Sequence, residues 1–227
     1  MSSARRRSPP AMSDQTTTTH GDGGPGGGLP DLGPVTERLA GLLDGVTDDH
    51  FDAPTPCPAM RVRELLSHLL GLTLAFRDAA RKELGPTTDV SPGDPNALGP
   101  APVGDWRGQL RSQLVELAEA WRDPAAWRGE TRAGGIDLPG EVAGAVALNE
   151  VLIHGWDLAR ATGQPYDVDP DSAGVAIELL AADADDPKAR EGGPFGPAHP
   201  VPAGASPLER AVALSGRAPS WTPPNGA

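Results

Sequence analysis

Five histidines are the side chains in this chain with the clearest capacity for acid–base or metal chemistry. Two lie in strongly apolar surroundings: His68 in the stretch Glu-Leu-Leu-Ser-His-Leu-Leu-Gly, and His154 in Asn-Glu-Val-Leu-Ile-His-Gly-Trp-Asp. A buried imidazole is costly unless its nitrogens have polar partners, so both histidines need polar neighbours inside the fold. The others, His20, His50 and His199, lie in polar or Pro/Gly-rich segments, and we predict that they are solvated.

A glutamate lies four residues before each of these two apolar-flanked histidines. Residues four apart share one face of an α-helix, so Glu150 and His154 can stack and chelate one divalent ion. A third ligand must then come from another helix, and His68 is the remaining buried histidine that can supply it. The spacing is common, however, and usually forms a simple ion pair, for which Glu64 and His68 are also correctly spaced. The pattern therefore leaves open a metal site of His68, Glu150 and His154 or ordinary ion pairs.

The elements that must position these side chains are helices. Apolar residues recur at steps of three and four, which is the spacing of one buried helical face. The pattern predicts an all-α protein with four main helices, most simply a four-helix bundle, followed by extra short C-terminal helices. The predicted helices cover residues 31–46, 61–84, 105–122, 140–161, 171–185 and 207–215.

Local signals mark the ends of several elements. Asp105 suits the N-cap of the third helix, Gly163 suits the position just after the fourth, and Gly85-Pro86 stops the second. Residues 125–140 are the least regular part of the body, and they fit a short pair of strands around Gly134-Gly135.

Composition divides the 227-residue chain into a polar tail and an acidic body. Residues 1–30 are rich in Gly and Thr and have few aliphatic side chains, so we predict a disordered tail, within which Met12 is an alternative start. We expect one folded domain over residues 31–217 and a flexible C-terminus over 218–227.

Charge, cysteine content and hydropathy exclude several classes of protein. The net charge of −12 argues against a broad nucleic-acid surface, and the single cysteine excludes an internal disulfide framework or a thiolate-rich zinc site. No apolar run approaches the roughly 20 residues that span a bilayer, and none follows the N-terminal arginines as in a secretory signal. We therefore expect a cytoplasmic protein without nucleic-acid or membrane partners.

Three stretches carry a resemblance to a known family. They are Pro-Thr-Pro-Cys at 54–57, Val-Arg-Glu-Leu-Leu-Ser-His-Leu-Leu-Gly at 62–71, and Glu-Val-Leu-Ile-His-Gly-Trp-Asp-Leu-Ala-Arg-Ala-Thr-Gly at 150–163. They resemble DinB/YfiT-like metal-binding proteins, in the actinobacterial group related to the metal-binding N-terminal domain of mycothiol-dependent maleylpyruvate isomerase. The similarity runs over residues 31–217.

The resemblance implies a four-helix bundle with a divalent metal, usually zinc, at one end. The family's ligands are a histidine on the second helix and a glutamate and a histidine one turn apart on a later helix, which match His68, Glu150 and His154. One departure is Met60, where such proteins commonly carry a tryptophan; this leaves the ligands alone but alters the wall of the site.

Three residues near these motifs need separate interpretation. Cys57 lies just before the second helix, where the helix dipole would lower a thiol pKa, but we interpret it as a structural turn residue. His68 lies about 10 Å farther along the helix axis, too far for Cys57 to share its metal. Asp157 either accepts from an imidazole N–H or contacts Arg160 or the helix backbone, and Trp156 lies in the core or beside the ligands.

Two functions from different classes are compatible with these features. The first is a zinc-dependent enzyme that activates a low-molecular-weight thiol such as mycothiol, in isomerase or S-transferase chemistry. The alternative is a non-catalytic metal-binding module that acts through a small ligand or a protein partner. A bundle without metal is disfavoured because two buried histidines would need other partners. A homodimer, the substrate and the catalytic residues are left open by the sequence.

Overall fold

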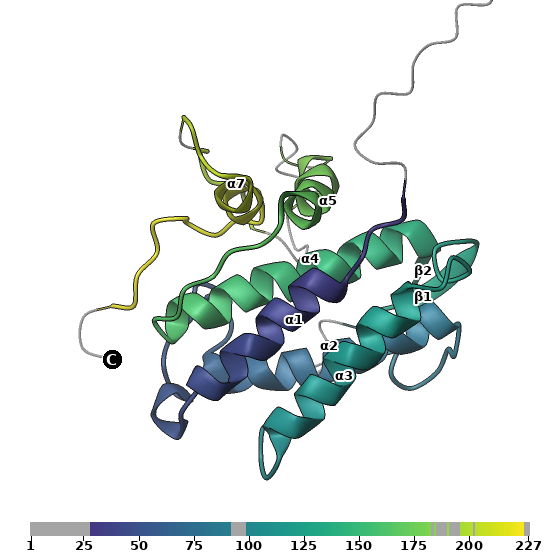
Figure 1. Ribbon diagram of the computed structural model, residues 1–227, viewed down its shortest axis with the longest axis horizontal. Coiled ribbons are helices and arrows are strands. Elements are labelled where there is room, and N and C mark those ends of the chain that lie inside the picture. Colours follow the sequence, from purple (N-terminus) through teal and green to yellow (C-terminus); the bar gives the residue numbers. More distant parts are fainter. Residues whose placement is uncertain are drawn as a thin grey trace, which may run out of the picture.

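The protein is a helical bundle followed by two further helices (Figure 1). This confirms the predicted all-α, DinB-like four-helix bundle with extra C-terminal helices. The computed structural model describes residues 28–91, 99–182, 184, 190, 196–201 and 203–224. The predicted tail over 1–30 therefore lies almost wholly outside the described residues, as do His20 and the last three residues of the predicted flexible C-terminus.

Four helices form the bundle, and each packs against two others. α1 contacts α3 and α4, and α2 contacts the same two helices. α5 packs on α4 and on α7, so the last two helices cover the side of α4 away from α2 and α3 (Figure 1). The helices are α1 (Gly33–Leu42), α2 (Val62–Arg81), α3 (Trp106–Trp121), α4 (Gly140–Ala161), α5 (Pro170–Ala181) and α7 (Pro207–Leu214).

The predicted apolar faces form the core of this bundle. The apolar residues that recur at steps of three and four on α3 are all buried: Trp106, Leu110, Leu114, Leu117 and Trp121. The first predicted helix is shorter than expected and continues as a 3₁₀ turn over Leu43–Gly45, with its apolar residues still buried. Within the described residues, no helix is both long and apolar enough to cross a bilayer.

Several predicted boundaries are confirmed. The Asp105 side chain accepts a hydrogen bond from the Gly108 N–H and caps α3, and α4 ends just before Gly163, whose φ is +68°. The irregular segment after α3 contains two antiparallel strands, β1 (Glu130–Ala133) and β2 (Ile136–Pro139). Gly134 and Gly135 join them with φ values of +62° and +74°, which suits a two-residue hairpin turn.

The predicted end of the second helix is wrong by three residues. α2 stops at Arg81 because Lys82 adopts the left-handed conformation, with a φ of +59°. The N–H groups of Lys82 and Glu83 donate to Ala79 and Asp78, which closes a Schellman motif with a lysine in the usual place of glycine. The Lys82 ammonium also donates to the Ala126 carbonyl at 3.0 Å, a contact that favours this backbone conformation.

The fifth predicted helix is also too long, because α5 ends at Ala181 rather than Asp185. The guanidinium of Arg190 donates to the Leu180 carbonyl, one of the carbonyls that the end of a helix leaves without a helical donor. A side chain from a later segment thus supplies the cap that a continuing helix would have provided. The last predicted helix, over 207–215, matches α7 to within one residue.

Candidate metal centre

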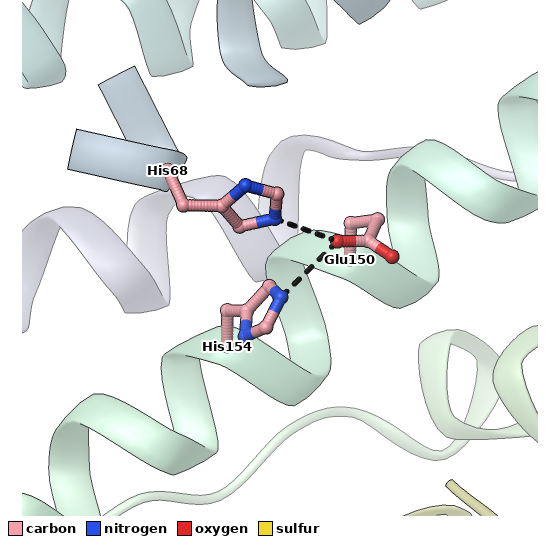
Figure 2. Close-up of side chains that lie close together, drawn as sticks. All are labelled: His68, Glu150 and His154. Carbon is pink, nitrogen blue, oxygen red and sulfur yellow. Dashed lines mark hydrogen bonds and ion pairs between the residues drawn. The ribbon is translucent and has the colours of Figure 1, made fainter. Parts of the chain in front are cut away.

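The packing of α2 on α4 brings together the three residues that the sequence singled out. Nε2 of His68 lies 3.4 Å from Oε2 of Glu150, and Nε2 of His154 lies 3.2 Å from the same oxygen (Figure 2). The three candidate ligand atoms all lie within 4.8 Å of one another. The two imidazole rings meet edge to face, with centroids 4.9 Å apart. The three side chains are therefore close enough to share one ion.

The cluster is more open on its α2 side than on its α4 side. The His68 side chain is 26% exposed and that of Glu150 is 15% exposed, whereas that of His154 is only 6% exposed. Glu150 and His154 face α2 because the spacing of four residues places both on one face of α4. His68 is therefore the most exposed of the three side chains, and His154 is the most buried.

Opposite charges stabilise this cluster without an ion. Burial opposes ionisation of Glu150, but hydrogen bonds with His154 and His68 outweigh it and hold the pKa of the Glu150 carboxyl well below its usual range. Burial likewise opposes charge on His154, but its hydrogen bonds with Asp157 and Glu150 raise the pKa of the imidazole to about 9. A divalent ion that bound to His154 would therefore displace a proton.

The two alternatives for Asp157 are resolved in favour of the histidine. Asp157 is fully buried, and its Oδ2 lies 3.0 Å from Nδ1 of His154, on the opposite edge of the ring from Glu150. Arg160 instead donates to the carbonyl of Trp221. Trp156 is buried, and the Arg160 guanidinium lies 5.9 Å from its ring centroid.

Sequence reasoning missed Arg217, which also contacts Asp157. The two residues are 60 positions apart, so no helical spacing links them. The sequence feature that could have indicated Arg217 is its position as a single arginine between the apolar end of the last predicted helix and Trp221.

Cys57 occupies a turn, as predicted, and lies outside the group of side chains that can share one ion. Its N–H donates to Oγ1 of Thr55, whose hydroxyl donates in turn to the Cys57 carbonyl. Burial raises the pKa of the Cys57 thiol, and the nearby Arg217 only partly opposes this. This direction favours the neutral thiol and agrees with the interpretation of Cys57 as a structural turn residue.

A surface pocket of about 410 Å³ lies beside this turn. Glu64 lies at its edge, one helical turn before His68, and its carboxylate accepts a hydrogen bond from the Arg61 N–H at 3.0 Å. Met60 is one of the residues that line this pocket. The lining residues are Pro54, Thr55, Cys57, Pro58, Ala59, Met60, Arg61 and Glu64.

The other two histidines in the described part of the chain, His50 and His199, lie outside the cluster. His50 was expected to be solvated, but its Nδ1 accepts a hydrogen bond from the Thr47 N–H at 3.0 Å and caps a short 3₁₀ turn over Asp48–His50. His199 is exposed in the loop before α7, as predicted.

Comparison with known proteins gives the same fold. An uncharacterised protein of Mycobacterium tuberculosis, from strains CDC 1551 / Oshkosh and ATCC 25618 / H37Rv, is 29% identical over 184 residues, which are 80% of this chain and 92% of the relative. The crystal structure of the mycothiol-dependent maleylpyruvate isomerase superposes with a TM-score of 0.53 at 22% identity, over 73% of this chain and 71% of that one. A mutant of that enzyme gives 0.51 at 20% identity, over 67% of this chain and 66% of that one.

The family assignment comes from a profile match over the bundle. The profile described as Mycothiol maleylpyruvate isomerase N-terminal domain matches residues 32–159, which begin just before α1 and end near the end of α4. The match covers more than half of the chain and contains all three residues of the cluster. The chain therefore belongs to the mycothiol maleylpyruvate isomerase N-terminal domain family.

Proposed function

We propose that this chain binds one divalent metal ion through His68, Glu150 and His154, with zinc as the preferred ion, and uses it to activate a low-molecular-weight thiol such as mycothiol. The observation that carries the proposal is the convergence of three ligand atoms from two helices within 4.8 Å of one another. Membership of a family described by mycothiol and maleylpyruvate isomerase supports the choice of thiol.

The residues present fit such an ion. Two imidazole nitrogens and one carboxylate oxygen are a common ligand set of catalytic zinc. Ligands about 2.1 Å from a tetrahedral ion lie about 3.4 Å from one another. The two distances from Glu150, 3.2 Å and 3.4 Å, are close to this separation, so an ion requires little rearrangement along these two edges.

The protein's own residues would hold and orient the ion and control access to it. When bound by three protein ligands, zinc keeps an open coordination position and lowers the pKa of a thiol that binds there. Asp157 would hold the His154 ring in place, and the partial exposure of His68 and Glu150 leaves the approach for a small thiol. The reaction class we propose is isomerase or S-transferase chemistry in the cytoplasm, where such thiols stay reduced.

A non-catalytic metal-binding module is the second candidate. It is favoured by the positions of the other histidines, because His50 caps a 3₁₀ turn and His199 is exposed in a loop. Within the described part of the chain, no further histidine therefore lies in the cluster to serve as a dedicated acid or base. Such a module would bind its ion and act through a small ligand or a protein partner.

Zinc content and thiol-dependent turnover, measured as both product formed and thiol consumed, test the proposal. The purified chain should contain about one zinc per chain, because it has one three-ligand site, and should convert an electrophile only when mycothiol is present. The thiol is consumed if the reaction is an S-transfer and is released again if it is an isomerisation. His154→Ala should lose both properties, whereas His50→Ala, which removes a histidine outside the cluster, should keep both. Thiol consumption without zinc would contradict the mechanism. Zinc without turnover on any electrophile would favour the non-catalytic module.

A further inference from the structure

The buried side of the cluster continues from His154 through two more polar groups. Asp157 lies directly behind the imidazole, and Nη2 of Arg217 donates to Oδ2 of Asp157 at 3.1 Å. Nε of Arg217 lies 3.5 Å from the other carboxylate oxygen. Arg217 is itself only 8% exposed, so this series of contacts links the cluster to the C-terminal segment inside the protein.

A turn at the end of α7 fixes where the Arg217 guanidinium lies. The N–H groups of Gly216 and Arg217 donate to Ala213 and Val212, which forms a Schellman motif. Gly216 has a φ of +81° and its Cα faces the backbone of Gly196, so a residue with a Cβ would be both strained and crowded there. Nη1 of Arg217 also donates to the Ser215 carbonyl at 3.1 Å, which fixes the guanidinium from its own side of the turn.

The chemistry of these groups determines which nitrogen of His154 is free. A carboxylate only accepts hydrogen bonds, so Asp157 requires a proton on Nδ1 of His154, and Nε2 is the nitrogen that gives up its proton to an ion. A guanidinium only donates, so Arg217 holds the carboxylate that selects this tautomer. Nε2 is the nitrogen that lies beside Glu150.

We propose that Arg217 is a positioning residue of the metal centre, which holds Asp157 and thereby keeps Nε2 of His154 directed at the ion. The inference rests on the proposed function, because it requires an ion between His68, Glu150 and His154. Arg217 lies outside residues 32–159, which the family profile matches. The segment after α7 thus contributes to a centre whose proposed ligands all lie within the matched region.

A simpler role for Arg217 would be to fasten the C-terminal segment to α4, and the chain contains a matched control for that role. Arg160 lies on α4, and its Nε donates to the Trp221 carbonyl at 3.1 Å. It therefore ties the same segment to the same helix without contacting Asp157 or the cluster. Removing Arg160 therefore tests only the attachment of the C-terminal segment to α4. Removing Arg217 tests this attachment together with the hydrogen bonds to Asp157.

The experiment measures metal affinity and the exchange of an imidazole proton in the full chain. Zinc affinity is measured by competition with a chelator for the wild type, Arg217→Met, Asp157→Asn and Arg160→Ala. We expect Arg217→Met and Asp157→Asn to weaken zinc binding by about 10- to 100-fold, as loss of a hydrogen-bond partner behind a ligand histidine commonly does. Arg160→Ala should stay within about twofold of the wild type, because no partner of a ligand is lost.

Proton NMR of the cobalt(II)-loaded chain provides a second measurement, the exchange rate of an imidazole proton. This rate would not change if Arg217 only attached the C-terminal segment to α4. The shifted Nδ1 proton of His154 should exchange slowly with D₂O in the wild type and in Arg160→Ala, because it is buried against Asp157. It should exchange faster in Arg217→Met. Circular dichroism checks folding, and if Asp157→Asn does not fold, Arg217→Met carries the test because methionine retains most of the apolar stem.

The outcomes separate this proposal from the proposed function. A wild type that binds neither zinc nor cobalt would overturn both. The second outcome is that the wild type binds zinc and that Arg217→Met has the same zinc affinity and the same exchange rate of the imidazole proton. This result would overturn only the positioning role. An equal loss of zinc affinity in Arg160→Ala and Arg217→Met would also overturn it, since attachment of the C-terminal segment to α4 would then account for the effect.

Discussion

Glu64 precedes His68 on α2 by the same four residues that separate Glu150 from His154 on α4, and the two glutamates have different partners. Glu64 is the third residue of α2, where backbone N–H groups lack helical acceptors, and its carboxylate accepts from the Arg61 N–H. Glu150 lies in the middle of α4, where every nearby N–H has a helical acceptor, and its carboxylate meets both histidines. The position of a glutamate within its helix thus decides whether an i, i+4 pair is available for an ion.

The largest expected difference between the two glutamates is in metal content. Glu150→Gln keeps the shape of the side chain but removes the charged ligand, so stoichiometric zinc should be lost. Glu64→Gln, the matched change one turn before His68, should leave about one zinc per chain, because Glu64 acts as a cap. Elemental analysis of both purified variants measures the difference. Loss of zinc in Glu64→Gln would show that the two pairs are equivalent after all.

The pH dependence of zinc affinity sharpens the same comparison. The ion needs the neutral imidazole of His154, whose pKa is raised to about 9 in the metal-free protein, so protons compete with the ion below that pH. Affinity should rise about tenfold from pH 7 to pH 8 and level off above the pKa. Chelator competition across this range gives the slope. Glu64→Gln should show the same slope, and a flat profile would contradict a proton on His154 that the ion must displace.

A smaller effect is expected on stability at the start of α2. Glu64→Ala removes the hydrogen bond to the Arg61 N–H and should cost about 1 kcal/mol, typical of a lost helix cap. For a domain of this size that corresponds to a thermal midpoint lower by about 2–4 °C. Differential scanning calorimetry of the metal-free protein tests this. An unchanged midpoint would indicate that the cap contributes little.

The smallest effect is expected at Cys57. Cys57→Ser should leave zinc content unchanged and keep most thiol-transfer activity, because the thiol lies outside the cluster that can share one ion. Zinc per chain and thiol consumption are measured together. A large loss of zinc would place Cys57 among the ligands, and a loss of activity alone would assign it a role in the reaction.

The sequence predicted the bundle and the three clustered residues better than it predicted their surroundings. The end of α4 was predicted correctly because Gly163 is a strong local signal. The end of α2 was missed because Lys82, which is not a glycine, adopts the left-handed conformation. Arg217 was missed for a different reason, since its contact with Asp157 depends on how the segment after α7 folds back on α4.

Gly155 lies directly after His154, and a Cβ there would press on the ring and hydroxyl of Tyr166. The same hydroxyl donates to the Leu152 carbonyl at 3.1 Å, so α4 and the segment that follows it are joined at this point. Positions 155 and 166 are therefore expected to vary together among homologues, with any larger residue at 155 accompanied by a smaller one at 166. A mutational library that randomises only one of these two positions should recover mostly the parental residue.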